Sequence, residues 1–191
     1  MCGRYYIEED DASIELMEII DAINRRENHP EFKSSGEFFP GDTAPVAALN
    51  RKKEKSAFPM KWGYAMGDKL VFNARSESAA SKPLFREGIV NHRCLIPASN
   101  YFEWDRRHTK YSVKGADGKS LLYMAGIYRM EGLLPVFTIL TRGPAEQISF
   151  LHDRMPVILP AEAMGDWLNT NYRAEEVLRA ARMDLWAEEA E

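Results

Sequence analysis

Apolar residues recur three or four positions apart in an early segment of the chain, at residues 13–26. The residues that form this stripe are Leu16, Ile19, Ile20 and Ile23. Such spacing places them on one face of a helix. Asp10 or Asp11 can accept hydrogen bonds from the first turn and cap its start. The segment is therefore predicted to be an amphipathic helix that packs against the rest of the fold.

Most of the remaining chain alternates short apolar runs with turn residues, which is typical of strands. Strands are predicted at residues 3–7, 46–50, 57–62, 70–72, 93–97, 101–104, 135–140 and 155–159. A β-hairpin is predicted from residues 111–113, through a turn at 115–118, to residues 121–128. Helices are predicted within 76–85 and 144–151, and two more close the chain. Because few helices separate the strands, we expect an α+β fold with a bent, mostly antiparallel or mixed sheet and peripheral helices.

Composition narrows the class of protein. The 191 residues are 45% apolar and 28% charged, as expected for one globular domain. No run of 18 apolar residues occurs and no signal-peptide pattern opens the chain, so neither a membrane span nor export is expected. The cysteines are Cys2 and Cys94 only. Two cysteines are too few for a disulfide framework or a zinc site, which predicts a cytoplasmic protein without a bound metal.

Charge is distributed unevenly along the chain. Acidic residues cluster at 8–11 and 188–191, whereas many arginines and lysines lie between these ends. The net charge of −4 argues mildly against nucleic acid as a partner. Local fields matter more than net charge, so a basic groove and a scatter of solvated charges are equally consistent with this composition.

The first four residues, Met1-Cys2-Gly3-Arg4, indicate candidate chemistry at the N-terminus. An aminopeptidase can remove Met1 because residue 2 is small, and Cys2 would then carry a free α-amine beside its thiol. The amine has a pKa of about 7.7–8.0 and the thiol one of about 8.5, so both can be activated at neutral pH. With an aldehyde, this pair can form a Schiff base and then a thiazolidine ring. Taken alone, these residues favour the alternative that Cys2 is an ordinary second residue.

Two polar residues follow the predicted strand at 70–72, in the sequence FNARSE. Asn73 can orient an amine or hold a carbonyl, although an asparagine here is more often a turn residue or helix cap. Arg75 would point the same way if the strand continues, and it could bind a phosphate. An isolated arginine is more often a surface charge, so both alternatives stay open.

Glu103 and His152 are candidates for proton transfer. Glu103 lies between aromatic residues in YFEW, and desolvation there would raise its pKa into the range of a proton shuttle. A solvent-facing glutamate in an alternating strand is equally consistent with the pattern. His152, in LHDRM, could position a sugar or phosphate or pass a proton, but it could also be a structural histidine. The chain lacks HExxH, CxxC, Walker and GxSxG patterns, so metal, nucleotide and serine-hydrolase sites have no support.

Several motifs occur in the order seen in one protein family. They are MCGRY, PGDTAPV, KWGYAM, FNARSES, CLIPASNYFEW and LHDRMPVIL, and they run from Cys2 to about Leu159. Together they resemble the SOS-response-associated peptidase family, whose members are also called abasic-site processing proteins. The resemblance implies a single α+β domain over residues 1–191, built on a strongly bent, barrel-like sheet. The motifs occupy residues 2–160 of that domain, and helices are expected over 161–191.

The resemblance also implies an activity. Family members bind single-stranded DNA and react through the N-terminal cysteine with the open-chain aldehyde of an abasic site. The product is a thiazolidine DNA–protein cross-link that shields the lesion during the DNA-damage response. Self-cleavage that exposes Cys2, and a lyase activity, are attributed to the family as well. We therefore expect single-stranded DNA with abasic sites as the partner, and a monomer that needs no cofactor, metal or membrane.

Residue roles carry over by motif. The resemblance implies that Cys2 is the nucleophile, Asn73 orients the terminal amine, Glu103 is the acid/base, and His152 positions the sugar and assists ring opening or reversal. Arg4, Pro40, Trp62 and Arg75 fall where the family contacts DNA. The segment between Trp62 and Phe72 looks short, which bears on the DNA-facing loop expected there.

Two other classes of function stay open at this point. One is a thiol hydrolase that uses Cys2 as nucleophile and His152 as base. The other is a non-covalent binder that stacks single-stranded bases on Trp62, Tyr101 and Phe102.

Overall fold

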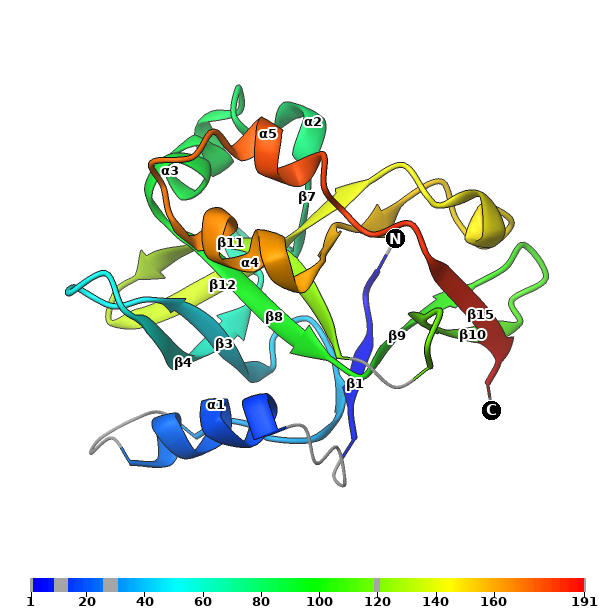
Figure 1. Cartoon of the computed structure of the whole chain (residues 1–191), viewed down its shortest axis with the longest axis horizontal. Coiled ribbons are helices and arrows are strands. Elements are labelled where there is room, and N and C mark those ends of the chain that lie inside the picture. The colour runs from blue at the N-terminus through cyan, green and yellow to red at the C-terminus, as the bar shows by residue number, and fades with distance from the viewer. Residues whose placement is uncertain (1, 9–13, 26–30, 119–120, 191) are drawn as a thin grey trace.

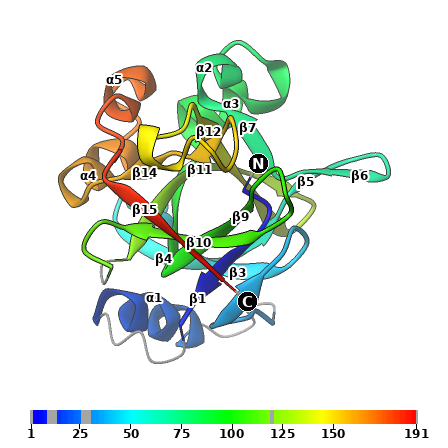
Figure 2. The same ribbon diagram turned by 90° about the vertical axis from the view of Figure 1, so that its right-hand side faces the viewer.

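A small closed barrel lies at the centre of the computed structural model, which describes residues 2–8, 14–25, 31–118 and 121–190. Its wall follows the order β12-β4-β3-β8-β11 and closes because β11 also pairs with β12. The strands are β3 (Thr43–Leu49), β4 (Lys55–Trp62), β8 (Arg93–Ala98), β11 (Leu122–Glu131) and β12 (Leu134–Arg142). All neighbours run antiparallel except β4 and β12, which are parallel. The strands curve around a common centre in Figure 2.

Shorter strands extend this barrel. β7 (Asn73–Arg75) and β13 (Met155–Pro156) pair with β12, and β14 (Ile158–Leu159) pairs with β11. β5 (Tyr64–Met66) and β6 (Lys69–Val71) form a separate hairpin that projects from the body (Figure 2).

A second, five-stranded antiparallel sheet lies beside the barrel, with the order β15-β10-β9-β1-β2. Its strands are β1 (Tyr5–Ile7), β2 (Gly36–Phe38), β9 (Asn100–Trp104), β10 (Lys110–Gly115) and β15 (Leu185–Glu189). β8 and β9 are separated only by Ser99, so one continuous chain segment passes from the barrel into this sheet. Cys2 and Glu103 are brought to the same region by β1 and β9, which are direct neighbours.

Helices cover two sides of the barrel (Figure 1). α1 (Ile14–Asn24) lies against β3 and β4, and the others lie on the opposite side. Those are α2 (Ser76–Ala79), α3 (Pro83–Asn91), α4 (Ala161–Leu168) and α5 (Ala174–Leu178), with a short 3-10 helix η1 at Glu146–Ile148. Within the described part of the chain, no helix is both long and apolar enough to cross a membrane.

The strand alternation divides the core into two clusters. On β3, Val46 and Ala48 join the cluster inside the barrel, whereas Ala47 between them joins the cluster under the helices. This follows from the two-residue period of a strand, which sends successive side chains to opposite faces. Both faces of the barrel wall are therefore apolar, which is why these strands read as nearly continuous hydrophobic runs.

The predicted fold class is confirmed: the chain is an α+β domain with a strongly bent, barrel-like sheet and peripheral helices. The early helix is confirmed as α1, and its proposed caps Asp10 and Asp11 lie outside the described residues. The expectation that only helices close the chain is wrong for residues 185–189. Those residues form β15, because Leu185 is buried and the segment completes the open edge of β10.

The predicted β-hairpin at residues 111–128 is also wrong. The turn at 115–118 is present, with Gly118 N–H donating to the Gly115 carbonyl at 2.8 Å. However, β10 pairs with β9 and β15, while β11 pairs with β8, β12 and β14. Local alternation reveals a strand but not its partner, and here the partners are distant in sequence.

One glycine of the barrel wall tests this packing. A Cβ at Gly126 would overlap Ile96 Cδ1 and lie 3.0 Å from both Cys94 Sγ and the Thr138 carbonyl oxygen. We expect Gly126→Ala to lower the free energy of unfolding by about 1–3 kcal/mol through overpacking. Gly165 of α4 has nothing within 4 Å of its added Cβ, so Gly165→Ala should raise stability by about 0.5–1 kcal/mol. Urea denaturation measures both, and equal effects of the two substitutions would contradict the close approach at Gly126.

Candidate functional site

Cys2 lies completely buried just before β1, inside the same core cluster as Tyr5 and Tyr101. Burial raises the pKa of its thiol well above that of a free cysteine, and the Glu103 carboxylate raises it further. A hydrogen bond with the backbone of Arg4 acts in the opposite direction but is a smaller effect. The thiol is therefore protonated in the free protein at neutral pH.

Asn73 contacts Cys2 directly. Its Nδ2 donates to the Cys2 carbonyl oxygen at 2.7 Å, across 71 positions of sequence. β7 holds Asn73 in place by pairing in parallel with β12, where Asn73 lies opposite Ile139. The Oδ1 atom of Asn73 is buried and has no hydrogen-bond partner among the described residues. An unused acceptor thus lies on the amide that already binds Cys2.

Glu103 is buried on β9, with about 5% of its surface exposed, and its charge acts on the Cys2 thiol. Burial of this side chain agrees with the desolvation expected from its aromatic neighbours in the sequence. Tyr101 lies two positions earlier, on the same face of the strand. The charges of Cys2 and Glu103 add to the effect of burial in raising the pKa of Tyr101. Cys2, Tyr101 and Glu103 therefore form one electrostatically coupled group.

Two tyrosine hydroxyls in this region have no hydrogen-bond partner among the described residues. Tyr5 lies directly opposite Tyr101 across β1 and β9, and both side chains are fully buried. Burial and the charge of Cys2 raise the pKa of Tyr5 also. Neither hydroxyl has a hydrogen-bond partner within the part of the chain that the structure describes. Sequence reasoning did not single out Tyr5, because the first motif reads as a short strand.

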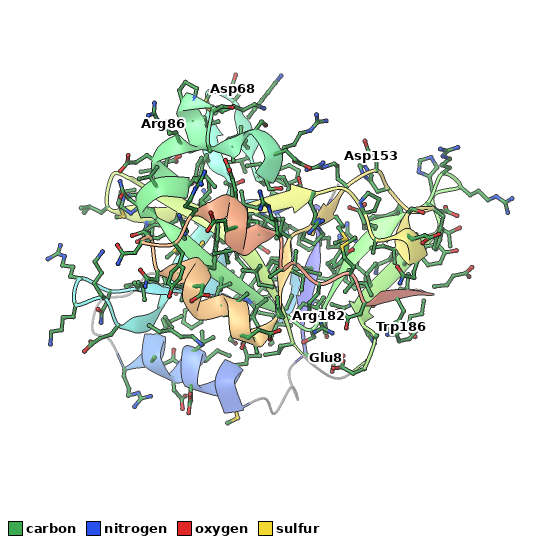
Figure 3. The ribbon with its side chains drawn as sticks, turned by 45° about the horizontal axis from the view of Figure 1, so that its top comes forward. Glu8, Asp68, Arg86, Asp153, Arg182 and Trp186 are labelled. Carbon is green, nitrogen blue, oxygen red and sulfur yellow. The ribbon has the colours of Figure 1, made fainter. Side chains whose placement is uncertain are left out.

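His152 lies in the segment between η1 and β13, with its side chain about one-third exposed. Its Nδ1 accepts a hydrogen bond from the Arg154 N–H at 3.0 Å and lies 2.7 Å from the carboxylate of Asp153. Asp153 itself projects from the surface (Figure 3). No contact between described residues joins His152 directly to Cys2.

Arg154 fixes this segment to the barrel. Its guanidinium binds both carboxylate oxygens of Glu77, at 2.8 and 2.7 Å, and donates to the Thr141 carbonyl at 2.5 Å. The hydrogen bond from Arg154 lowers the pKa of Glu77. Thr141 lies opposite Arg75 in the pairing of β7 with β12. The segment that carries His152 is therefore held next to the strand that carries Asn73 and Arg75.

An exposed stack of rings and cations lies on the second sheet. The Arg4 guanidinium carbon lies 4.6 Å from the centre of the Phe39 ring and 4.8 Å from that of Trp104. Arg4 also pairs with Glu37 at 3.7 Å. Trp104 and Phe39 were not identified as site residues from the sequence, although Trp104 follows Glu103 and Phe39 precedes Pro40. Alternation along β9 places Trp104 on the face opposite Glu103. This alternation is the feature of the sequence that could have identified Trp104.

Pro40 occupies a tight turn beside this stack. The Asp42 N–H donates to the Phe39 carbonyl at 3.0 Å, and Gly41 has a φ of 103°, as in a type II turn with Pro and Gly at its centre. Two further hydrogen bonds hold the turn. The Gly41 N–H donates to the Trp62 carbonyl at 2.7 Å, and the Trp62 N–H donates to the Asp42 carbonyl at 2.8 Å. The turn is thereby fixed to the end of β4.

Trp62 does not lie on the surface, so its assignment to direct DNA contact is corrected. The side chain is completely buried, stacked on Phe137, and its Nε1 donates to the Phe72 carbonyl at 2.9 Å. An apolar indole with a satisfied N–H gains more from burial than from exposure. Tyr101 and Phe102 are buried too, which removes all three stacking rings of the non-covalent alternative. Arg75, by contrast, is exposed at the end of β7.

Metal ligation was tested from the side chains present. Among the described residues, no group of three or more histidine, cysteine, aspartate or glutamate side chains could hold a metal ion.

The chain is similar to known proteins over its whole length. The chain is 30% identical to the abasic site processing protein YobE of Bacillus subtilis, over all of this chain and 92% of that protein. It is 30% identical to the abasic site processing protein YoqW of the same organism, with 90% of that protein covered. A crystal structure of a Bordetella bronchiseptica protein superposes over the whole of both chains with a TM-score of 0.75 at 24% identity, which supports the fold. The family model described as SOS response associated peptidase (SRAP) matches residues 1–189, and the chain therefore belongs to that family.

Proposed function

We propose that this protein processes abasic sites in DNA, and that Cys2 does so by forming a covalent cross-link with the lesion. The observation that carries the proposal is the buried pairing of Asn73 with Cys2 beside Glu103. Its relatives YobE and YoqW are named abasic site processing proteins, which supports the same class of substrate. The reactive partner is the open-chain aldehyde of an abasic deoxyribose in single-stranded DNA.

The reaction begins with the nitrogen of Cys2. In the printed sequence Met1 precedes it, so removal of Met1, by self-cleavage or by an aminopeptidase, must first convert an amide into a free amine. The amine then adds to the aldehyde carbon, giving a carbinolamine. Loss of one water leaves an imine. The thiol adds to the imine carbon, and its proton passes to the nitrogen, which closes the thiazolidine ring with one C–N and one C–S bond to the same carbon.

The surroundings of Cys2 fit this order of steps. Because the thiol is protonated in its buried position, the amine is the better first nucleophile. In the proposal, the free Oδ1 of Asn73 accepts a hydrogen bond from that amine while its Nδ2 holds the Cys2 carbonyl. The Glu103 carboxylate carries a proton from the nitrogen to the leaving hydroxyl of the carbinolamine, and later carries the thiol proton to the nitrogen. A preorganised pair of this kind reduces the entropy cost of ring closure.

The remaining predicted residues are assigned to the DNA strand. Arg4 and Arg75 would contact phosphates, and the Pro40 turn would lie against the bases next to the lesion. Phe39 and Trp104, stacked on Arg4, add aromatic surface for a base. His152 would position the opened sugar and assist reversal, which includes any lyase step. In this proposal it would reach the site through the segment that Arg154 fixes to β12.

A thiol hydrolase is less consistent with this geometry. Such an enzyme needs a thiolate stabilised by a neighbouring histidine, which lowers the cysteine pKa. Burial and Glu103 raise the pKa of Cys2 instead, and no hydrogen bond between described residues joins His152 to Cys2. The site therefore favours chemistry that starts at nitrogen.

Insertion of one alanine between Met1 and Cys2 tests the proposal. After removal of Met1 the free amine and the thiol would lie on different residues, so a thiazolidine cannot close. The amine would also move by about 3.5 Å, one residue of extended chain. We expect no heat-stable adduct on abasic single-stranded DNA in a denaturing gel, with non-covalent binding nearly unchanged. A stable adduct from the insertion variant, its mass confirmed, would show that the N-terminal cysteine mechanism is wrong.

Replacement of Glu103 tests the acid/base assignment. Glu103→Gln keeps the size of the side chain but removes its proton transfer, so single-turnover cross-linking should slow by about 10²–10⁴-fold. Glu87→Gln, an exposed substitution on α3, is the matched control and should leave the rate unchanged. Near-normal rates for Glu103→Gln would remove this residue from the mechanism.

Salt dependence tests the phosphate contacts. With about four contacts to a single strand, the plot of log affinity against log salt concentration should have a slope near ~−3. Arg75→Ala should make the slope shallower by about 0.7, the share of one contact. Arg25→Ala, on the far side of the barrel at the end of α1, serves as the control. A slope near zero for the unmodified protein would contradict the assigned DNA surface.

A further inference from the structure

An apolar groove lies at the end of the barrel away from Cys2. It forms where β4 and β12 separate, because these parallel strands share only the pairs Lys61–Val136 and Trp62–Phe137. Beyond those pairs the wall opens and leaves a hollow of about 690 Å³. Its apolar lining is Phe58, Met60, Tyr128, Met130 and Pro135. Phe58 and Tyr128 pack against the barrel interior, so the floor of the groove is an extension of the core.

Several apolar side chains are exposed at the turn beside the groove. Between β11 and β12, Leu133 is 95% exposed and Met130 is 57% exposed. Leu134 is half exposed on the same turn. Contiguous exposed apolar surface of this kind marks an interaction site, whereas single exposed apolar residues do not. Methionine suits such a surface because its flexible thioether adapts to different partners.

The rim of the groove is basic. Arg51, Lys52 and Glu54 line it from the loop between β3 and β4. The Glu54 carboxylate accepts a hydrogen bond from Asn50 at 3.1 Å, within its own loop. Residues 51–55, RKKEK, hold four basic side chains against one acidic, on a protein whose net charge is −4. The local charge is therefore opposite to that of the whole chain, and it would attract an acidic partner.

We propose that this groove binds a peptide segment of a partner protein that combines acidic residues with large apolar ones. The apolar side chains would enter the hollow between β4 and β12, and the acidic ones would meet Arg51 and Lys52. Nucleic acid fits less well, because the two rings of the lining, Phe58 and Tyr128, are partly buried against the barrel interior, and the exposed apolar side chain of the lining is Met130. A second copy of this chain fits less well too. Its acidic C-terminal segment already forms β15, which pairs with β10, and there Glu188 forms an ion pair with Lys114 at 3.0 Å.

The groove is separate from the proposed cross-linking site. The β3–β4 loop and the β11–β12 turn lie together at the left of Figure 1, whereas the chain begins to the right of the barrel. A bound peptide would thus not cover the segment that carries Cys2, and the protein could be recruited by a partner while it reacts with DNA.

Selection from a phage-displayed library of random dodecapeptides on the full-length protein tests this surface. We expect enriched peptides that pair aspartate or glutamate with leucine, phenylalanine or tryptophan. Their affinity, measured by fluorescence anisotropy, should fall at least tenfold for the double variant Arg51→Glu/Lys52→Glu and for Met130→Glu. These positions are exposed, so the fold should persist, and an unchanged melting temperature confirms that.

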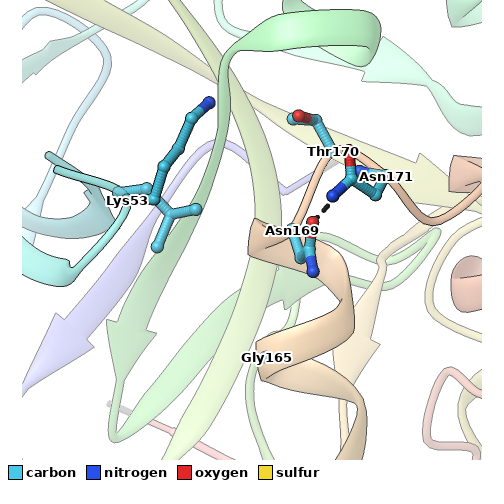
Figure 4. A pocket seen from close by; sticks show the side chains of 6 residues that line it. Lys53, Gly165, Asn169, Thr170 and Asn171 are labelled. Carbon is cyan, nitrogen blue, oxygen red and sulfur yellow. Dashed lines mark hydrogen bonds between the residues drawn. The ribbon is translucent and has the colours of Figure 1, made fainter. Parts of the chain in front are cut away.

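Lys53 supplies the matched control within the same loop. It lines a different pocket, of about 320 Å³, together with Gly165, Asn169, Thr170 and Asn171 (Figure 4). Lys53→Glu reverses one charge there, half of the change in the double variant, and peptide affinity should stay within about twofold. Cross-linking to abasic DNA should be unchanged in all these variants, so the outcome is independent of the proposed function.

Several results would overturn the inference. One is the absence of any enriched peptide, or enrichment of peptides whose binding all variants retain. Another is loss of affinity for an undamaged single-stranded oligonucleotide in Arg51→Glu/Lys52→Glu, which would assign the rim to nucleic acid. A third is self-association in sedimentation that Met130→Glu abolishes, which would assign the groove to a second copy of the chain.

Discussion

The rest of the site depends on the contacts that the buried indole of Trp62 makes. Its Nε1 holds the Phe72 carbonyl, immediately before Asn73, and its ring packs between Tyr5 and Phe137. Its backbone binds Gly41 and Asp42 in the turn that contains Pro40. Three parts of the site, separated widely in sequence, are therefore fixed by one side chain and its peptide groups. A tryptophan buried in this way must satisfy its N–H, and that requirement determines where Asn73 lies.

Burial also determines the chemistry that Cys2 can perform. A thiol in the core, next to a carboxylate, keeps its proton, while the carbonyl of the same residue binds the Asn73 amide, whose Oδ1 has no hydrogen-bond partner among the described residues. In water the two nucleophiles would have similar pKa values. Burial raises the pKa of the thiol, and in the proposed reaction this favours attack by nitrogen first and by sulfur second. The same burial explains why the residues proposed to contact DNA, Arg4 and Arg75, lie at more accessible positions on neighbouring segments and not at Cys2 itself.

Sequence patterns predicted the parts of this structure that local spacing controls. The helix around Leu16, the short strands and the bent-sheet class follow from periodicity and from the scarcity of helices. The pairing of β10 with β9 and β15 could not be predicted, because alternation is the same whichever strand lies alongside. Trp62 was misplaced for a related reason: a tryptophan in a strand can face either way, and only the closed barrel decides that it faces inward. Phe39 and Trp104 became visible as site residues once the fold placed them on either side of Arg4.

The most direct test of the central claim is the mass and position of the adduct. The protein, with Met1 removed, is incubated with a single-stranded oligonucleotide containing one abasic site, without any reductant, and the product is analysed by intact and peptide mass spectrometry. A thiazolidine predicts the summed mass of protein and oligonucleotide less one water, with the modification on Cys2. The ring contains no imine, so the adduct should survive without borohydride. An adduct that maps to a lysine and requires borohydride for its stability would contradict the account.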